Sequence, residues 1–240
     1  MPSLPALRQV VLLARDLTGA LDEARGLLGL NPGVRDAESM AALGFEHEVL
    51  AIDETFLEVV SPLSAESSAG RLLAARGEGG YMVVLQVPDL DALVDRAAGL
   101  DLKPILHETF EGNPMSQWHP RDLGTLAELD EMRVADWHFC PALSDTGSTA
   151  VASDIVAVEL AVPDPEAYAR RWAGLLDLSL DPGETILPLG TGELRFVPLG
   201  DGAPGLRRVR LAASPGTADT TATLCGVRFE VLAGPAVTPW

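Results

Sequence analysis

The chain has 240 residues, enough for one large domain or two small ones, and its content of 47% hydrophobic and 22% charged residues is that of an ordinary globular protein. The formal net charge of −18 would repel a phosphate backbone or an anionic membrane surface, so neither nucleic acid nor membrane is an expected partner. No apolar run approaches the ~20 residues of a membrane span. Residues 1–5 lack the basic and apolar regions of a signal peptide, which predicts a cytoplasmic protein.

One short phrase recurs along the chain. Residues 9–16 (QVVLLARD), 82–89 (MVVLQVPD) and 157–164 (AVELAVPD) align at spacings of 73 and 75 residues, and a degenerate copy at 208–215 follows after 51 more. Each copy is a run rich in apolar residues that stops at Asp, Pro or Ser. This pattern predicts a strand followed by the N-cap of a helix.

The segments after the first three copies have helical periodicity, and their predicted N-caps are Asp16, Asp89 and Asp164. The predicted helices cover residues 17–28, 90–98 and 165–176. The fourth copy is followed by too few residues, rich in Thr, for a helix. Hairpins are predicted at 49–60, 185–197 and 221–231, and in the second copy a loop precedes the closing strand within 118–129.

The repeats divide the chain into two halves. Copies one and two occupy the predicted amino-terminal domain, residues 1–142, and copies three and four occupy the carboxy-terminal domain, residues 154–240. Small polar residues within 143–153 predict a linker between them.

The repeating unit and its opening phrase resemble the βαβββ module of the vicinal oxygen chelate superfamily, which includes glyoxalase I, methylmalonyl-CoA epimerase, extradiol dioxygenases and bleomycin-resistance proteins. Residues 53–62 (DETFLEVVSP), 79–86 (GGYMVVLQ) and 119–122 (HPRD) are most similar to glyoxalase-like proteins. The resemblance implies an α+β fold in which four modules, the last two shortened, pair into two incomplete barrels around clefts.

The resemblance also implies a set of metal ligands. In the amino-terminal half their positions fall on Gln9, Glu58, Met82 and Glu128. The oxygen ligands Gln9, Glu58 and Glu128 suit a divalent ion such as Mn, Fe, Ni or Zn, whereas a thioether prefers softer ions. In the carboxy-terminal half the same positions fall on Ala157, Arg195, Arg208 and Arg228. Guanidinium groups cannot ligate a cation, so this half is expected to serve packing, or to hold an anion if the arginines converge.

Two functions remain open. One is a glyoxalase-like isomerase, lyase or dioxygenase in which Glu58 and Glu128 hold a metal or act as an acid and base pair. The alternative is a metal-free protein of the bleomycin-resistance type that sequesters a small molecule. Each side chain also has a purely structural interpretation: Gln9 as a hydrogen-bonded wall residue, Met82 as core and Glu58 as a solvent-facing strand residue.

A second group of candidate residues lies near the end of the first half. Aromatic residues are only 5% of the chain yet gather here, so a substrate pocket is predicted, with the alternative that the tryptophans cover the barrel mouth. The predicted pocket residues are Trp118, His119, Arg121, Trp137 and His138, together with Met82. His47 lacks the second histidine of a zinc helix and is expected at the surface. We expect a homodimer, and the net charge disfavours an anionic acyl-CoA ester as ligand.

Overall fold

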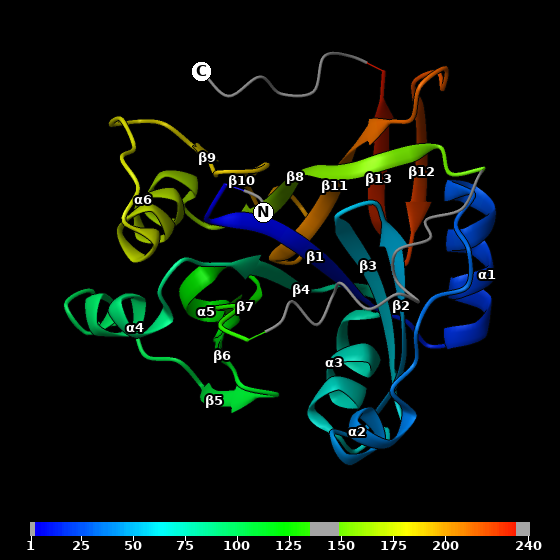
Figure 1. The fold of residues 1–240 in the computed structure, drawn as a ribbon, viewed down its shortest axis with the longest axis horizontal. Coiled ribbons are helices and arrows are strands. Elements are labelled where there is room, and N and C mark those ends of the chain that lie inside the picture. The colour runs from blue at the N-terminus through cyan, green and yellow to red at the C-terminus, as the bar shows by residue number, and fades with distance from the viewer. Residues whose placement is uncertain (1–2, 135–148, 234–240) are drawn as a thin grey trace.

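The computed structural model describes residues 3–134 and 149–233, which form two mixed sheets, one from each half of the chain (Figure 1). Sheet A has the strand order β2-β3-β1-β4-β7-β6-β5. Its strands are β1 (Ala6–Leu13), β2 (Phe45–Ile52), β3 (Thr55–Pro62), β4 (Gly79–Gln86), β5 (Leu106–Phe110), β6 (Asn113–Trp118) and β7 (Leu126–Asp130). The helices of this half are α1 (Leu17–Leu28), α2 (Ala37–Ala42), α3 (Ser68–Arg76), α4 (Leu90–Ala98) and α5 (Pro120–Leu123).

Sheet B has the strand order β12-β13-β11-β8-β10-β9. Its strands are β8 (Ala152–Val162), β9 (Ile186–Pro188), β10 (Glu193–Pro198), β11 (Gly205–Ala213), β12 (Thr220–Leu224) and β13 (Val227–Leu232), with the helix α6 (Pro165–Leu176). The last two residues of the predicted linker 143–153 belong to β8.

The two sheets are built on the same plan. In each, the opening strands of two copies pair antiparallel at the centre, β1 with β4 and β8 with β11, and the closing strand of each copy lies parallel to its own opening strand. This arrangement confirms the predicted α+β fold of four modules in two incomplete barrels. In the first copy the outermost strand is reduced to a bridge between Val34 and Val49. The fourth copy passes from β11 to β12 without a helix, as predicted.

The predicted helix starts are confirmed at their caps. The side chains of Asp16, Asp89 and Asp164 accept hydrogen bonds from backbone N–H groups three residues later, at 3.1, 2.9 and 3.0 Å. Each bond satisfies a donor that the first helical turn leaves without an intrahelical partner. No helix in residues 3–134 and 149–233 combines the length and apolarity needed to cross a bilayer.

A single apolar core joins the two halves. It contains residues of both sheets, such as Val10 and Val158, together with Trp118 and Trp172. The Trp172 indole donates to the Leu123 carbonyl at 2.9 Å, which ties α6 to α5 across the two halves. Figure 1 shows α4 and α6 side by side on the left and α1 on the right. The face of each sheet that turns away from this core carries buried polar side chains, such as Gln9 and Glu58 in sheet A and Glu230 in sheet B, and in sheet A these lie beside smaller apolar clusters.

Candidate active site

Four of the predicted site residues share one face of sheet A. Gln9 is in register with Val84, and Val84 is in register with Glu128, while Val11 links Glu58 to Met82 in the neighbouring row. Alternate residues of a strand point to the same side, and the residues between them, such as Val10, lie in the shared core. The face that carries the four predicted residues is therefore opposite the core, and it is named here the site face. The structure therefore brings Gln9, Glu58, Met82 and Glu128 to one side of the half-barrel, and all four are buried.

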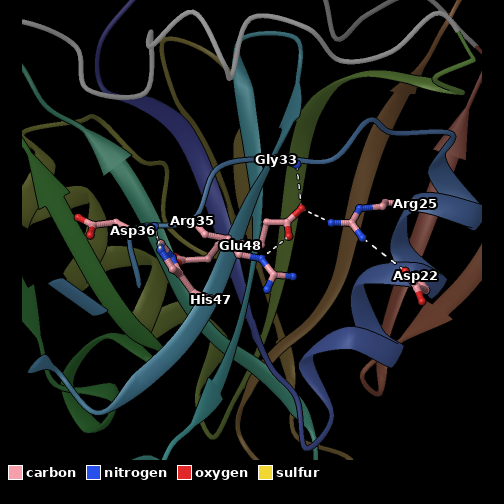
Figure 2. Close-up of polar contacts among 8 residues, drawn as sticks. Asp22, Arg25, Gly33, Arg35, Asp36, His47 and Glu48 are labelled. Carbon is pink, nitrogen blue, oxygen red and sulfur yellow. Dashed lines mark hydrogen bonds and ion pairs between the residues drawn. The ribbon is translucent and has the colours of Figure 1, made fainter. Parts of the chain in front are cut away.

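Glu58 accepts hydrogen bonds at both carboxylate oxygens. The Gln9 amide Nε2 donates to Oε2 at 2.7 Å, and His47 Nδ1 lies 2.6 Å from Oε1. The backbone N–H of Asp36 donates to His47 Nε2 at 2.9 Å, a contact drawn in Figure 2. Since Nε2 accepts, the proton of the neutral imidazole is assigned to Nδ1, which donates to Glu58. Glu58 is thus oriented as a carboxylate by two side-chain donors.

A second carboxylate holds the segment that fixes His47. Glu48, the next residue of β2, points away from the site face and binds Arg25, the Gly33 amide at 2.8 Å and Arg35 at 2.7 Å (Figure 2). Burial alone would raise the pKa of Glu48, but these hydrogen bonds outweigh burial and lower it. The network anchors residues 33–36 beside β2 and so places the Asp36 amide against the imidazole.

The surface prediction for His47 is wrong, because its side chain is only 9% exposed and bonded on both nitrogens. One of its partners lies on the adjacent strand β3 and the other is a backbone amide eleven residues away. The surface prediction rested on the missing second histidine of a zinc helix, and histidine spacing carries no information about either of these contacts. The one available signal was the alternation of β2, which places His47 on the same face as Val49, the cross-strand partner of Glu58.

Glu128 lies in a different electrostatic setting. Its carboxylate accepts one hydrogen bond from Gln117 Nε2 at 2.7 Å and is 6% exposed. Burial raises the pKa of Glu128 to about 7, the Gln117 bond opposes this rise, and the charges of Glu58 and Glu108 add to it. Near neutral pH both the acid and the carboxylate form of Glu128 are populated, which is the property of a general acid or base.

Two further residues reach the site face through β-bulges. The pairing of β1 with β4 shifts between Leu7 and Gln9, which leaves Arg8 as the extra residue, and shifts again opposite Tyr81. The Arg8 guanidinium lies 5.8 Å from the centroid of the Phe56 ring, and Tyr81 packs with the apolar cluster around Met82. Burial and the charge of Glu58 raise the pKa of Tyr81. Simple alternation could not place either side chain, because a bulge changes which face a residue occupies.

Apolar side chains cover much of the site face. Met82 packs with Val11, Val60 and Val84, and α3 contributes Leu73 to the same cluster. A hollow of about 560 Å³ lies elsewhere, lined by Asp53 and by residues 149–153 and 214–217, and one of about 250 Å³ lies where α4 meets α6. Glu58 and Glu128 line neither of these two hollows, and both are buried beside the apolar side chains of the site face.

The donor set does not match a preformed metal site. Within residues 3–134 and 149–233, no three His, Cys, Asp or Glu side chains are arranged to hold a metal ion. Both oxygens of Glu58 and one of Glu128 accept N–H groups of the protein, and the fourth position is the Met82 thioether. A cation would have to displace these hydrogen bonds. The divalent metal remains a prediction.

The other predicted pocket residues lie apart from the carboxylates. Trp118 is fully buried in the core on the opposite face, with its indole donating to Ser116 Oγ at 2.9 Å. His119 is the exposed N-cap of α5 and accepts from the Arg121 amide at 3.0 Å. The Arg121 side chain is exposed as well. Trp137 and His138 lie outside the described residues.

Comparisons with known proteins agree with this architecture. A family model described as a glyoxalase-like domain matches residues 10–176, well over half of the chain. A hypothetical protein from Staphylococcus aureus, 11% identical, has a similar structure with a TM-score of 0.68 over 95% of this chain and 98% of that one. None of the curated proteins compared with the chain matches it.

Two methylmalonyl-CoA epimerases also match part of the chain. The Mycobacterium tuberculosis enzyme is 24% identical, with a TM-score of 0.48 over 55% of this chain and 91% of that one. The Streptomyces coelicolor enzyme, a variant in complex with 2-nitronate-propionyl-CoA, is 20% identical, with a TM-score of 0.49 over 55% of this chain and 100% of that one.

Proposed function

The chain belongs to the family of glyoxalase-like domains, and on that premise we propose that it is an isomerase-type enzyme that moves a proton at a carbon next to a carbonyl group. One observation carries the proposal. Two buried carboxyl groups share the site face in different settings, Glu58 bonded to two donors and Glu128 with its pKa raised to about 7. Pairs of titratable groups in contrasting environments are typical of acid and base catalysis.

Glu58 is the general base in this proposal. Its carboxylate takes the proton from the carbon next to the carbonyl, and the electron pair of the broken C–H bond moves into the carbonyl to form an enolate. Protonated Glu128 then gives its proton to the enolate, either at the same carbon from the other side or at a neighbouring atom. The substrate keeps its composition and oxidation level, and one proton transfer from Glu58 to Glu128 resets the pair.

Gln9, His47 and Gln117 are positioning residues. Gln9 and His47 hold both oxygens of Glu58, and Gln117 holds one oxygen of Glu128. Oriented side chains lower the barrier because the reacting groups do not have to be ordered during the reaction. The Asp36 amide extends the set by fixing the imidazole tautomer.

The second candidate is a metal-free protein that sequesters a small molecule. The apolar cluster around Met82 favours it, because most ligand pockets are lined by apolar side chains with a few polar groups. A binding protein does not need Glu128 to change protonation state, so the two candidates differ in chemistry and can be separated.

Hydrogen–deuterium exchange provides the test. Purified protein in D₂O is incubated with small α-hydroxy aldehydes, α-hydroxy ketones and acyl thioesters, and loss of the α-proton signal is followed by NMR. We expect exchange with the wild type and a loss of about 10²-fold or more of that exchange in Glu58→Gln, the usual size of a base contribution. Glu128→Gln should keep the exchange that Glu58 catalyses and lose a similar factor in product formation. Glu184→Gln, an exposed loop carboxylate, is the matched control and should match the wild type.

Two outcomes would contradict the proposal. Exchange at the wild-type rate in Glu58→Gln, or product formation at the wild-type rate in Glu128→Gln, would remove that residue from the chemistry. A compound that raises the melting temperature without any exchange would favour the binding protein. Parallel samples treated with a chelator or loaded with Mn²⁺, Ni²⁺ or Zn²⁺ show whether the predicted metal site operates.

A further inference from the structure

The register of sheet B shows which of its residues occupy the positions of the sheet A site. In sheet A, Glu128 is in register with Val84 of β4, and Val84 is in register with Gln9 of β1. The corresponding residue of sheet B is Glu230 of β13, because it is in register with Arg210 of β11, and Arg210 is in register with Ala157 of β8. The alignment that placed Arg228 here is therefore wrong by two residues. The four equivalent positions of sheet B hold Ala157, Arg195, Arg208 and Glu230.

Sheet B has a strongly charged face on the side opposite the core. We name it the arginine face, and it consists of Glu159, Glu193, Arg195, Arg208, Arg210, Arg228 and Glu230. Four arginines against three glutamates leave one positive charge, in a chain whose net charge is −18. Arg208, Arg210 and Arg228 come from the neighbouring strands β11 and β13 and converge as one patch, whereas Arg195 lies on β10, beyond β8, and pairs with Glu193.

Glu230 is the centre of this patch. Its carboxylate lies 2.9 Å from Arg228 Nε, 3.2 Å from Arg210 Nε and 3.4 Å from Arg208 Nε. One buried negative charge is thus shared by three guanidinium groups, and the other nearby carboxylate, Glu159, lies 3.6 Å from Arg208.

The outer ends of two guanidinium groups are available to a ligand. Arg210 and Arg228 contact Glu230 through Nε, and their terminal nitrogens make no hydrogen bond within the described part of the chain. Their side chains are 25% and 53% exposed. Arg208 and Arg228 are also direct cross-strand neighbours, an arrangement that destabilises a sheet unless an opposite charge offsets it.

We propose that the arginine face binds a small oxyanion of the phosphate class, with Arg210 and Arg228 as the principal ligands. The planar guanidinium fork matches the spacing of phosphate oxygens, and a doubly charged anion would offset the like-charge repulsion between neighbouring arginines. The negative charge of the rest of the chain repels polyanions, so the patch suits a single phosphate or phosphate ester. This site is separate from the acid and base pair of sheet A and does not depend on its chemistry.

Titration with inorganic phosphate tests this site. Binding is measured by calorimetry at constant ionic strength, with NaCl replacing phosphate in the reference. We expect saturable binding by the wild type and at least a tenfold loss of affinity in the double variant Arg210→Gln/Arg228→Gln. Arg170→Gln on α6 removes an exposed arginine that does not belong to the arginine face. It is the matched control and should bind phosphate like the wild type.

A second measurement keeps the test decisive if the double variant does not fold. The Nε–H resonances of arginine are followed by NMR in the wild type, and phosphate should shift those of Arg210 and Arg228, assigned from the single variants. Absence of saturable binding by the wild type would overturn the proposal. Unchanged affinity in a folded double variant would show an adventitious ion only and would overturn it as well.

Discussion

Replacing Glu128 by glutamine should stabilise the protein above neutral pH. The pKa of Glu128 is about 7 in the folded protein against 4.5 for an ordinary glutamate, and each pKa unit corresponds to about 1.4 kcal/mol. The folded protein therefore disfavours the charged form of Glu128 by about 3 kcal/mol, chiefly through burial. Between pH 4.5 and 7 the folded protein holds a proton that the unfolded chain has released, so the free energy of unfolding falls as pH rises, and above pH 7 the full cost is present.

Glutamine removes this cost because it keeps an oxygen for the Gln117 donor and cannot ionise. Urea unfolding at pH 5, 6, 7 and 8 measures the effect. The variant should be similar to the wild type at pH 5 and more stable by up to about 3 kcal/mol at pH 8. The control Glu184→Gln should run parallel to the wild type at every pH. Curves for Glu128→Gln that also run parallel to the wild type would refute the assignment of a raised pKa to Glu128.

Three other changes test separate parts of the structure. His47→Phe removes the donor to Glu58, so proton exchange should slow by about 10- to 100-fold, with partial rescue in His47→Asn. Trp172→Ala should lower the free energy of unfolding by about 3–5 kcal/mol while leaving one transition in urea, because the core is shared by both halves; two transitions would contradict this. Glu230→Gln should destabilise by about 1–2 kcal/mol because three partly exposed arginines lose their shared carboxylate, and added phosphate should restore more stability than NaCl of equal ionic strength.

The elements that could be predicted from the sequence are those with local causes. The caps at Asp16, Asp89 and Asp164 are confirmed because capping depends on residues within one turn. The repeated phrase located the central strands, and the hairpin predictions follow from a turn between two apolar runs. The missing helix of the fourth copy was also visible, because β-branched residues and a short segment disfavour helix formation locally.

The residues that the sequence misplaced depend on strand register. Trp118 and Gln117 are neighbours in the chain, yet Gln117 pairs with Glu128 and so faces the site, which leaves Trp118 in the core. The concentration of aromatic residues could not reveal this, since it does not specify a face of the sheet. Glu230 rather than Arg228 occupies the last position of the sheet B set, because strand register and not the sequence resemblance fixes that position.

The central claim is that Glu128, unlike an ordinary glutamate, is partly in its acid form near neutral pH. Titration of the glutamate carboxyl groups tests this claim most directly. With glutamate labelled at the side-chain carboxyl carbon, each carboxyl can be followed by NMR between pH 3 and 9. One resonance should titrate near pH 7 in the wild type and be missing from Glu128→Gln. If every glutamate resonance titrates below about pH 5, as unperturbed carboxyls do, Glu128 is not held in its acid form near neutrality and the acid and base pair is contradicted.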